Sequence, residues 1–424
     1  MSEAGSRLVA LDLVRGVAVL GILAINVGGF AGPIAGTLSP NQPLPGTLAD
    51  EAWFAFTLVV FEGKMRALFS LLFGASMALF MDRADAAGRD GERLQMRRLG
   101  WLALFGYLHY LLWWGDILFL YALAGLSALA LRSAPPRALA AGALALFAAW
   151  HLGMAAAALP RIAAEQAVLS GAASPGEAGA YATARAAEGA ATAAEMARYR
   201  EGFLAQIAHK LREDPAEPLG AALATMGETL PLMLLGIALY RLGFFHGGIA
   251  PPTLRRIVGW GLGLGGALTL AFAALAWHRH FPPVLMIESM AYGLALPHLL
   301  MALGYAALLV RAAPHLAASR TGRCLIAAGR MAFTNYLAMT VVMTFVFYGW
   351  GLGLVGTVPP RWQAPFVLAG WALMLGWSAP WLARFGQGPL EWLWRSLTAW
   401  QRQPFRRAPA PLSPSRKGSS DCAA

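Results

Sequence analysis

Residues 8–30 read LVALDLVRGVAVLGILAINVGGF, an apolar run long enough to cross a lipid bilayer as a helix. The run also holds Asp12, Arg15 and Asn26, which a plain membrane anchor does not need. A bare charge at the bilayer centre costs about 2.5–3.5 kcal/mol on insertion scales, so such groups usually face protein or water and mark a functional site. Asp12 and Arg15 are three residues apart, which places them on one helical face where they can pair. The stretch therefore predicts a first span with a polar seam.

The composition extends this prediction to the rest of the chain. Hydrophobic residues make up 58% of the 424 residues and charged residues 13%, against about 25% charged in soluble proteins. Nine further apolar runs are continuous rather than alternating, which favours helices over strands as the spanning elements. We therefore expect an all-α, polytopic membrane bundle with about ten spans. The predicted spans are 8–30, 53–82, 98–114, 116–133, 137–159, 218–240, 255–277, 288–310, 331–351 and 363–383.

The distribution of arginine predicts how the bundle is oriented. The loop 82–98 is short and holds five arginines, and short basic loops stay in the cytoplasm. Alternation from that loop places both termini in the cytoplasm, while the short loops on the other side hold only Arg279 and Arg361. The formal net charge of +11 is then a positive-inside bias, so we expect the lipid bilayer as a partner and no nucleic acid. The predicted location is the cell inner (plasma) membrane.

The spans and loops divide the chain into four predicted parts. Residues 1–159 form an N-terminal five-helix half, and residues 218–398 form a C-terminal five-helix half that ends in an interfacial helix rich in tryptophan and arginine. Between them, 160–217 is an extracytoplasmic loop whose Ala- and Glu-rich composition favours helix. This loop is either a helical cap or a lid that recognises substrate. The basic tail 399–424 has the composition of a disordered segment.

Topology sorts the polar residues of the spans into two layers that we expect to face one cavity. The outer layer consists of Asn26, Glu62, Lys64, Arg66, His109 and Asp116. The inner layer consists of Asp12, Arg15, Arg330, Asn335 and Tyr336. Near mid-depth lie His151, Glu228 and His298. Glu228 needs a cationic partner, for which Lys64 and Arg15 are candidates. His151 fits a satisfied core group, whereas His298, which follows Pro297, either is such a group or lines a cavity beside a proline kink. We predict no metal site and no bound cofactor.

The predicted span 53–82 is unusually long. At helical rise it measures about 45 Å, against a hydrocarbon core of about 30 Å. It therefore either tilts or breaks near Gly63, and a break would expose backbone groups that can bind an anion. Glu62, Lys64 and Arg66 flank that point. They either hold an anionic substrate or extend their charged ends to the membrane interface.

His109 and Asp116 flank a tight turn in GYLHYLLWWGDILFLYALAG, residues 106–125. Imidazole titrates near pH 6.5, so His109 can take and give a proton at working pH. A nearby carboxylate can orient the ring and raise its basicity. The alternative interpretation is that Asp116 caps the helix that follows it.

Five stretches of this chain resemble the signature blocks of the YeiB-like family of uncharacterised bacterial inner-membrane proteins. They are RLVALDLVRGVAVLGILAINVGGF (7–30), FEGKMRALFSLLFGASMALF (61–80), LHYLLWWGDILFLYALAG (108–125), GRMAFTNYL (329–337) and GPLEWLWRSLT (388–398). The resemblance covers nearly the whole chain and implies no established reaction.

The first span is also similar, more distantly, to the opening span of the transmembrane acyltransferase superfamily, which includes heparan-alpha-glucosaminide N-acetyltransferase. That similarity implies passage of an acyl group from a cytoplasmic thioester such as acyl-CoA, as co-substrate, to an extracytoplasmic sugar or lipid-linked acceptor. Asn26 matches the asparagine of the pattern. Those enzymes carry a histidine in or soon after the first span, whereas residues 27–50 here contain none, and His109 is the candidate replacement.

On this hypothesis the catalytic residues are His109 as general base, Asp116 as its orienting partner and Asn26 as an oxyanion donor. The substrate-binding candidates are Glu62, Lys64, Arg66, Asp12, Arg15, Arg330, Asn335, Tyr336 and Glu228. Two other functions fit the same residues. A proton-coupled transporter would use the ionisable groups as a proton path, and a non-catalytic membrane component would use them only to hold the bundle together.

Overall fold

The computed structural model describes residues 8–406, which form helices and turns and contain no strand. Six helices are long and apolar enough to cross a membrane, and a bent pair adds a seventh if it counts as one span. The six are α1 (Val9–Ala31), α7 (Pro136–Leu169), α10 (Glu217–Arg241), α11 (Pro251–His278), α13 (Ala295–Ala318) and α16 (Ala364–Phe385) with the turn before it. The bent pair is α14 (Arg320–Arg330) and α15 (Ala332–Phe347), which meet at 83°. The all-α membrane fold is thereby confirmed, while the count of ten spans and the cytoplasmic termini stay predictions.

Most of the other helices complete the bundle without meeting the length and apolarity expected of a span. They are α3 (Leu48–Val60), α4 (Lys64–Ala86), α5 (Gly91–Leu112) and α6 (Leu118–Leu129). Helices α3 and α6 are short, and α4 and α5 carry several charged side chains. The remaining short elements are α2 (Ile34–Leu38), α12 (Pro283–Glu288), a π-helical turn (Ser289–Gly293) and a 3₁₀ turn (Pro360–Trp362).

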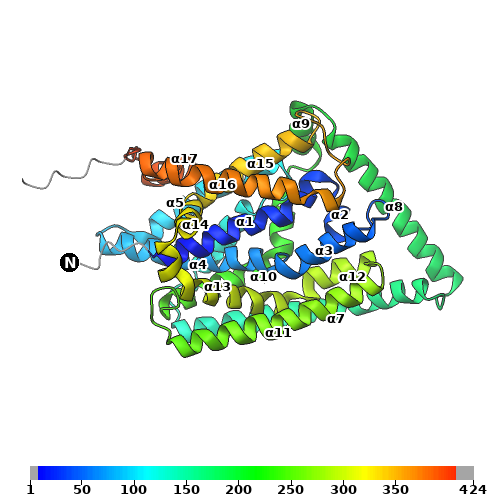
Figure 1. Cartoon of the computed structure of the whole chain (residues 1–424), viewed down its shortest axis with the longest axis horizontal. Helices are drawn as coiled ribbons and strands as arrows, with labels where there is room; N and C mark the ends of the chain where they lie inside the picture. Colours follow the sequence, from blue (N-terminus) through cyan, green and yellow to red (C-terminus); the bar gives the residue numbers. More distant parts are fainter. Residues whose placement is uncertain (1–7, 407–424) are drawn as a thin grey trace, which may run out of the picture.

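Helix α1 runs through the middle of the bundle, and α4, α13, α14, α15 and α16 pack against it (Figure 1). Two glycines allow the closest of these contacts. A Cβ atom at Gly16 would lie 2.0 Å from the carbonyl oxygen of Leu325, and one at Gly329 would lie 1.8 Å from that of Asp12. The polar side chains of α1 therefore face protein rather than lipid.

The predicted span 53–82 is broken, which is one of the two alternatives that its length allows. Helix α3 ends at Val60, α4 begins at Lys64, and Gly63 between them has φ = +71°. The Lys64 ammonium donates a hydrogen bond to the carbonyl oxygen of Leu58 at 2.6 Å, and the Tyr305 hydroxyl donates to that of Val60 at 3.2 Å. These bonds satisfy carbonyls that the end of α3 leaves without helical partners.

The break lies near the middle of α1. A Cβ atom at Gly21 would lie 2.4 Å from the sulfur of Met65 and 3.3 Å from the ring of Phe61, which places the break beside the thirteenth residue of a 23-residue helix. Polar groups at the break are therefore deep inside the bundle. The interpretation in which Lys64 extends to the membrane interface is wrong, because its side chain is fully buried.

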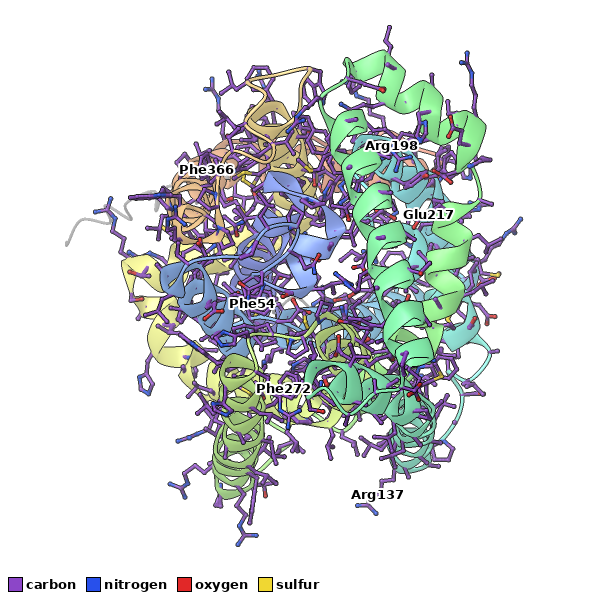
Figure 2. All side chains as sticks on the ribbon, turned by 90° about the vertical axis from the view of Figure 1, so that its right-hand side faces the viewer. Phe54, Arg137, Arg198, Glu217, Phe272 and Phe366 are labelled. Carbon is purple, nitrogen blue, oxygen red and sulfur yellow. The ribbon has the colours of Figure 1, made fainter. Side chains whose placement is uncertain are left out.

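The segment 160–217 is helical, as its composition predicts. Helix α7 continues through Pro160 to Leu169, and α8 (Pro175–Tyr199) and α9 (Phe203–Glu213) follow. These two helices cover the end of the bundle opposite the N-terminus, with α8 along the right-hand edge of Figure 1; Figure 2 views this end directly. The ring of Tyr199 stacks on that of Tyr348 with centroids 4.7 Å apart.

Lys210 ties α9 to the bundle. Its ammonium group donates a hydrogen bond to the carbonyl oxygen of Tyr110 and lies 4.7 Å from the centre of that ring. Burial lowers the pKa of Lys210 to about 8, so the side chain is still mostly charged at neutral pH. The cap is thereby held by a cation at the edge of the helix bundle.

The predicted interfacial helix is α17 (Pro389–Ala399), and it packs against α5 and α15. The Trp394 indole nitrogen donates a hydrogen bond to the carbonyl oxygen of Arg98 at 2.9 Å. Helix α17 is therefore part of the bundle wall. Most of the predicted tail, from residue 407 onward, lies outside the described residues, and the division of the chain into four domains stays a prediction.

Candidate functional site

Two cavities lie toward opposite ends of α1. One has a volume of about 190 Å³, is lined by Arg15, Arg98 and Arg330, and is called here the arginine cavity. The other has a volume of about 460 Å³ and is lined by Asn26 and by three acidic residues. We call it the carboxylate cavity, and its acidic residues are Glu62, Asp116 and Glu217. Members of the two layers expected from the sequence thus line two separate cavities rather than one, and the other members lie outside both linings.

Asn26 and Glu62 line the carboxylate cavity, and their polar side-chain groups are available to a ligand. Within the described part of the chain, neither side chain forms a hydrogen bond. Arg66 also lines this cavity and pairs with Glu228, with Nε–Oε1 and Nη2–Oε2 distances of 3.2 Å each. Arg66 is thus the partner of Glu228, and both predicted candidates for that role were wrong. A ligand in this cavity meets an amide, a free carboxylate and one paired guanidinium.

Lys64 does not line the carboxylate cavity, although its sequence neighbours do. Its side chain is 0% exposed and its ammonium group is bound to the end of α3. A cation at that position also opposes the negative end of the α3 helix dipole. In this structure Lys64 supports the helix break and does not contact the cavity.

His109 and Asp116 form a pair, with 2.8 Å between Nδ1 of the ring and Oδ1 of the carboxylate. The same carboxylate accepts hydrogen bonds from the backbone N–H groups of Leu118 at 3.1 Å and Phe119 at 2.8 Å, so Asp116 also caps α6. The two interpretations of Asp116 are therefore compatible. His109 is 1% exposed and lies behind Asp116, and its Nε2 atom is 2.9 Å from Oγ1 of Thr340.

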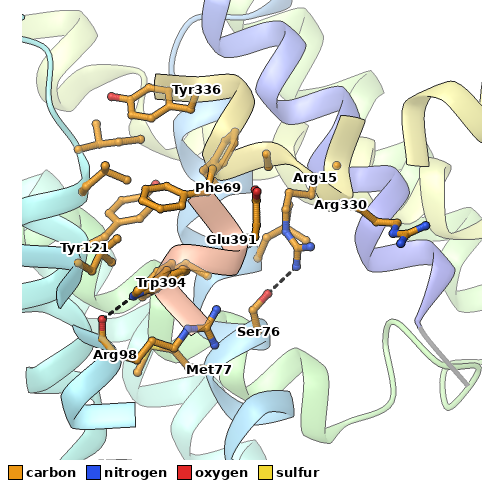
Figure 3. Close-up of a pocket in the computed structure, with 18 of the residues that line it drawn as sticks. Arg15, Phe69, Ser76, Met77, Arg98, Tyr121, Arg330, Tyr336, Glu391 and Trp394 are labelled. Carbon is orange, nitrogen blue, oxygen red and sulfur yellow. Dashed lines mark hydrogen bonds between the residues drawn. The ribbon is translucent and has the colours of Figure 1, made fainter. Parts of the chain in front are cut away.

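The arginine cavity combines cations with an apolar wall (Figure 3). Arg15 lies between two partners, donating to Oδ1 of Asp12 and to Oγ of Ser76 at 2.8 Å each. The Asp12–Arg15 pair expected from their spacing is thus formed, and Asp12 holds Arg15 from outside the cavity lining. The wall is formed by Phe69, Leu72, Phe73, Leu102, Ile117, Leu118 and Phe333.

The other two arginines of this cavity are held by different groups. The guanidinium of Arg98 lies 4.1 Å from the ring centre of Trp394, a cation–π contact. Arg330 donates a hydrogen bond to the carbonyl oxygen of Gly386 at 2.8 Å. Glu391 of α17 lines the same cavity and accepts hydrogen bonds from the backbone and hydroxyl of Thr334. Arg98 and Glu391 were not among the predicted site residues, because Arg98 lies in the basic loop that indicates orientation and Glu391 lies in the predicted interfacial helix.

Asn335 and Tyr336 have distinct positions. Asn335 is buried at the α14–α15 bend, where its amide donates to Ala328 and Ser378 and accepts from Trp377, so all of its polar atoms are engaged in structure. The Tyr336 hydroxyl donates to the carbonyl oxygen of Gly115 at 3.1 Å, and its side chain lines the arginine cavity.

A small gap of about 10 Å³ shares lining residues with both cavities. Its lining includes Asn26, which also lines the carboxylate cavity, and Tyr336, which also lines the arginine cavity. Thr340 lines the gap as well, and Ile117 lines both cavities. The partition between the cavities is therefore a single layer of side chains.

Residues 239–401 match the family described as protein of unknown function, DUF418. Over 405 residues the chain is 32% identical to the uncharacterized protein YeiB of Escherichia coli (strain K12), which covers 92% of this chain and 96% of YeiB. The chain belongs to the YeiB-like family. It is also 28% identical over 417 residues to the uncharacterized protein YxaH of Bacillus subtilis (strain 168), covering 95% of this chain and 96% of YxaH. No solved structure matches the chain.

This YeiB-like chain is therefore a membrane protein of a family of unknown function. The DUF418 match supplies Arg330, Tyr336, Thr340 and Glu391, so the C-terminal part of the site lies inside the family's defining region. His109 comes from the part of the chain before it. No group of three or more His, Cys, Asp or Glu side chains suited to a metal ion occurs among residues 8–406.

The two mid-depth histidines of this YeiB-like protein differ. Nδ1 of His151 lies 2.8 Å from the carbonyl oxygen of Phe147, as expected of a satisfied core group. His298 packs over Gly63, and its Nε2 atom is buried without a hydrogen-bond partner in the described structure. The interpretation of His298 as a fully satisfied core group is therefore wrong.

We expect Glu228→Gln to lower the stability of this YeiB-like protein by about 1–3 kcal/mol, because Arg66 would lose its counter-charge. The loss is smaller than for a fully buried pair, since the Arg66 side chain is 35% exposed. Replacing both residues by methionine should recover part of the loss. Thermal melting in detergent measures the stability of both variants and of the unchanged protein. A double variant that is less stable than Glu228→Gln would contradict this account.

Proposed function

We propose that this protein is a membrane acyltransferase that passes an acyl group from a thioester donor in the arginine cavity to an acceptor in the carboxylate cavity. The observation that carries this proposal is the single layer of side chains between two cavities of different chemistry, with the His109–Asp116 pair beside it. A reaction across that layer needs no passage of either whole substrate through the bundle.

The side chains of the arginine cavity suit the phosphate and acyl groups of the donor. Guanidinium groups bind phosphate oxygens in bidentate geometry, and the wall of phenylalanine and leucine suits an acyl chain. Acyl-CoA carries both chemical features, with Arg15, Arg98 and Arg330 as the phosphate-binding residues. Acyl-CoA is found on the cytoplasmic side, so this assignment implies that the arginine cavity opens toward the cytoplasm. The five arginines of the loop 82–98 predict the same orientation.

The acceptor fits the carboxylate cavity. Asn26, Glu62 and Arg66 offer hydrogen-bond donors and acceptors of the kind that sugar hydroxyls require. A sugar or a lipid-linked sugar is the acceptor class, which the bilayer or the outer solution would deliver. Losing one oxyanion donor typically lowers kcat by about 10²–10³, which is the effect that we assign to Asn26.

The test uses purified protein in proteoliposomes with radiolabelled acetyl-CoA or palmitoyl-CoA on the N-terminal side and glucose oligomers on the other. We expect release of the free thiol and label in the sugar fraction. Arg98→Met should raise KM for the acyl-CoA by about 10- to 100-fold, because a charge-assisted contact is worth about 1.5–3 kcal/mol. Arg97→Met is the matched control, since Arg97 is next in sequence and does not line the cavity. Thiol release that neither requires the protein nor responds to Arg98→Met would refute the proposal.

A transporter is the second candidate, because of the broken helix α3–α4 at mid-depth. Interrupted helices near the bilayer centre form the substrate sites of many transporters. The same proteoliposomes distinguish the two functions, since uptake of an intact labelled molecule without a covalent product favours transport. If variants in both cavities lose folded protein but no activity is ever found, a non-catalytic role remains.

A further inference from the structure

Three polar side chains from three parts of the chain form one hydrogen-bonded series. Asp116 Oδ1 lies 2.8 Å from Nδ1 of His109, and Nε2 of the same ring lies 2.9 Å from Oγ1 of Thr340. A carboxylate, an imidazole and a hydroxyl in this order are the parts of an activated nucleophile: the acid orients the ring, and the ring removes the hydroxyl proton. The arrangement is recognised by geometry and roles, independently of fold.

The Thr340 hydroxyl has two acceptors within reach, and the ring is the closer one. Its Oγ1 atom is 3.3 Å from the carbonyl oxygen of Tyr336 and 2.9 Å from the imidazole. Thr344, one turn later, bonds only to backbone carbonyls, with its hydroxyl 2.7 Å from the oxygen of Thr340. Back-bonding of this second kind is ordinary for a threonine in a helix. The contact with His109 is what sets Thr340 apart.

Thr340 also lies where the two cavities approach each other. It lines the small gap together with Tyr336, which borders the arginine cavity, and Asn26, which borders the carboxylate cavity. A gap of about 10 Å³ is close to the size of one water molecule. Tyr336 lines both the gap and the arginine cavity, so its ring is a boundary between these two spaces.

We propose that Thr340 is a covalent nucleophile that carries the acyl group between the two cavities, an inference that rests on the proposed acyl transfer. Oγ1 of Thr340 attacks the thioester carbonyl carbon while His109 takes the hydroxyl proton, and the C–S bond then breaks. The thiolate leaves with that proton as the free thiol, and the acyl group remains on Thr340 as an oxygen ester. An acceptor hydroxyl from the carboxylate cavity next attacks this ester, gives its proton to His109 and receives the acyl group, which restores the threonine hydroxyl.

Asn26 is placed to serve both half-reactions. It borders the gap and the carboxylate cavity, and its side-chain amide forms no hydrogen bond to any other described residue. An amide N–H directed at the carbonyl oxygen would stabilise the negative charge that develops in each tetrahedral intermediate. Asp116 acts on this scheme by holding the ring and stabilising the imidazolium.

The test is single-turnover acetylation of the purified protein without an acceptor, using acetyl-CoA and, separately, p-nitrophenyl acetate as a small activated ester. We expect mass spectrometry to find one acetyl group on the peptide that contains Thr340, removable by hydroxylamine. Thr340→Val and His109→Gln should lower the rate of adduct formation by about 10³-fold or more, whereas Thr340→Ser should stay within about tenfold. Thr344→Val is the matched control and should acetylate like the unchanged protein.

The outcomes separate this inference from the function on which it rests. If Thr340→Val transfers the acetyl group from acetyl-CoA to an acceptor at the unchanged rate, the covalent intermediate is refuted and the acyltransferase stands. If p-nitrophenyl acetate labels Thr340 and acetyl-CoA neither labels it nor releases thiol, the nucleophile stands and the acyl-CoA donor is refuted. An adduct on another residue, or none from either donor, overturns the inference.

Discussion

Replacing Gly63 by alanine is expected to lower the free energy of unfolding by about 2–6 kcal/mol. Gly63 has φ = +71° and ψ = −37°, a backbone conformation that costs an L-residue about 1–3 kcal/mol. A Cβ atom there would lie 1.9 Å from Nδ1 of His298, so the ring must move at a further cost of about 1–3 kcal/mol. Together these costs are a large share of the 5–15 kcal/mol that typically stabilises a folded protein.

Two control variants separate the backbone cost of Gly63→Ala from its steric cost. Gly88 has φ = +70° and no atom within 4 Å of its Cβ position, so Gly88→Ala measures the cost of a positive φ without a steric contact. Adding His298→Ala to Gly63→Ala removes the ring and should recover the steric share. Size-exclusion chromatography measures the folded yield of these variants, and thermal melting measures their stability. Equal melting temperatures for Gly63→Ala and Gly88→Ala would show that the contact with His298 costs nothing.

Asp116→Asn is expected to reduce acyl transfer by about 10²–10⁴-fold while the protein stays folded. An asparagine can accept through only one of its two side-chain atoms. Either the cap bond from Phe119 is lost, or the bonds from His109 and Leu118 are lost together. If the amide nitrogen faces the ring, Nδ1 must become the acceptor and the proton moves to Nε2, which then cannot take a proton from Thr340. The corresponding change in serine-protease triads costs about 10⁴ in kcat.

Asp90→Asn is the control for the cap. The Asp90 side chain accepts a hydrogen bond from the backbone N–H of Arg93 at the start of α5, so the same substitution there tests a helix cap away from the candidate site. Both variants should lose about 1 kcal/mol of stability or less, and only Asp116→Asn should lose the transfer rate. A kcat for Asp116→Asn equal to that of Asp90→Asn would refute the orienting role.

Local sequence patterns predicted those helices whose formation depends on a single property of the sequence, such as a continuous apolar run. The first span was expected at 8–30 and forms at Val9–Ala31, because a continuous apolar run has no other stable state in lipid. The length of the run 53–82 allowed either a tilt or a break near Gly63, and the structure has the break. Helix α7 continues past the predicted end of the fifth span, through Pro160 to Leu169, because the following residues still favour helix.

Contacts between distant segments were much less predictable. The His109–Asp116 pair joins residues seven apart and was expected, whereas Thr340 lies 231 residues from His109 and left no signal in its own stretch. Glu228 was known to need a cation, yet Arg66 is its partner by the packing of α10 against α4, which no local pattern encodes. The two cavities likewise depend on how α1 packs among its neighbours. Most polar residues of the site were therefore predicted from the sequence, whereas several of the contacts between them were not.

The pairing of Arg66 with Glu228 has a consequence for the history of this family. The two residues are 162 positions apart, so no single genetic event is expected to replace both. A lineage that lost one charge would carry a less stable protein until a second substitution compensated for it. Among family members the two positions should accordingly vary together, with charged pairs in some branches, apolar pairs in others, and few descendants holding one charge alone.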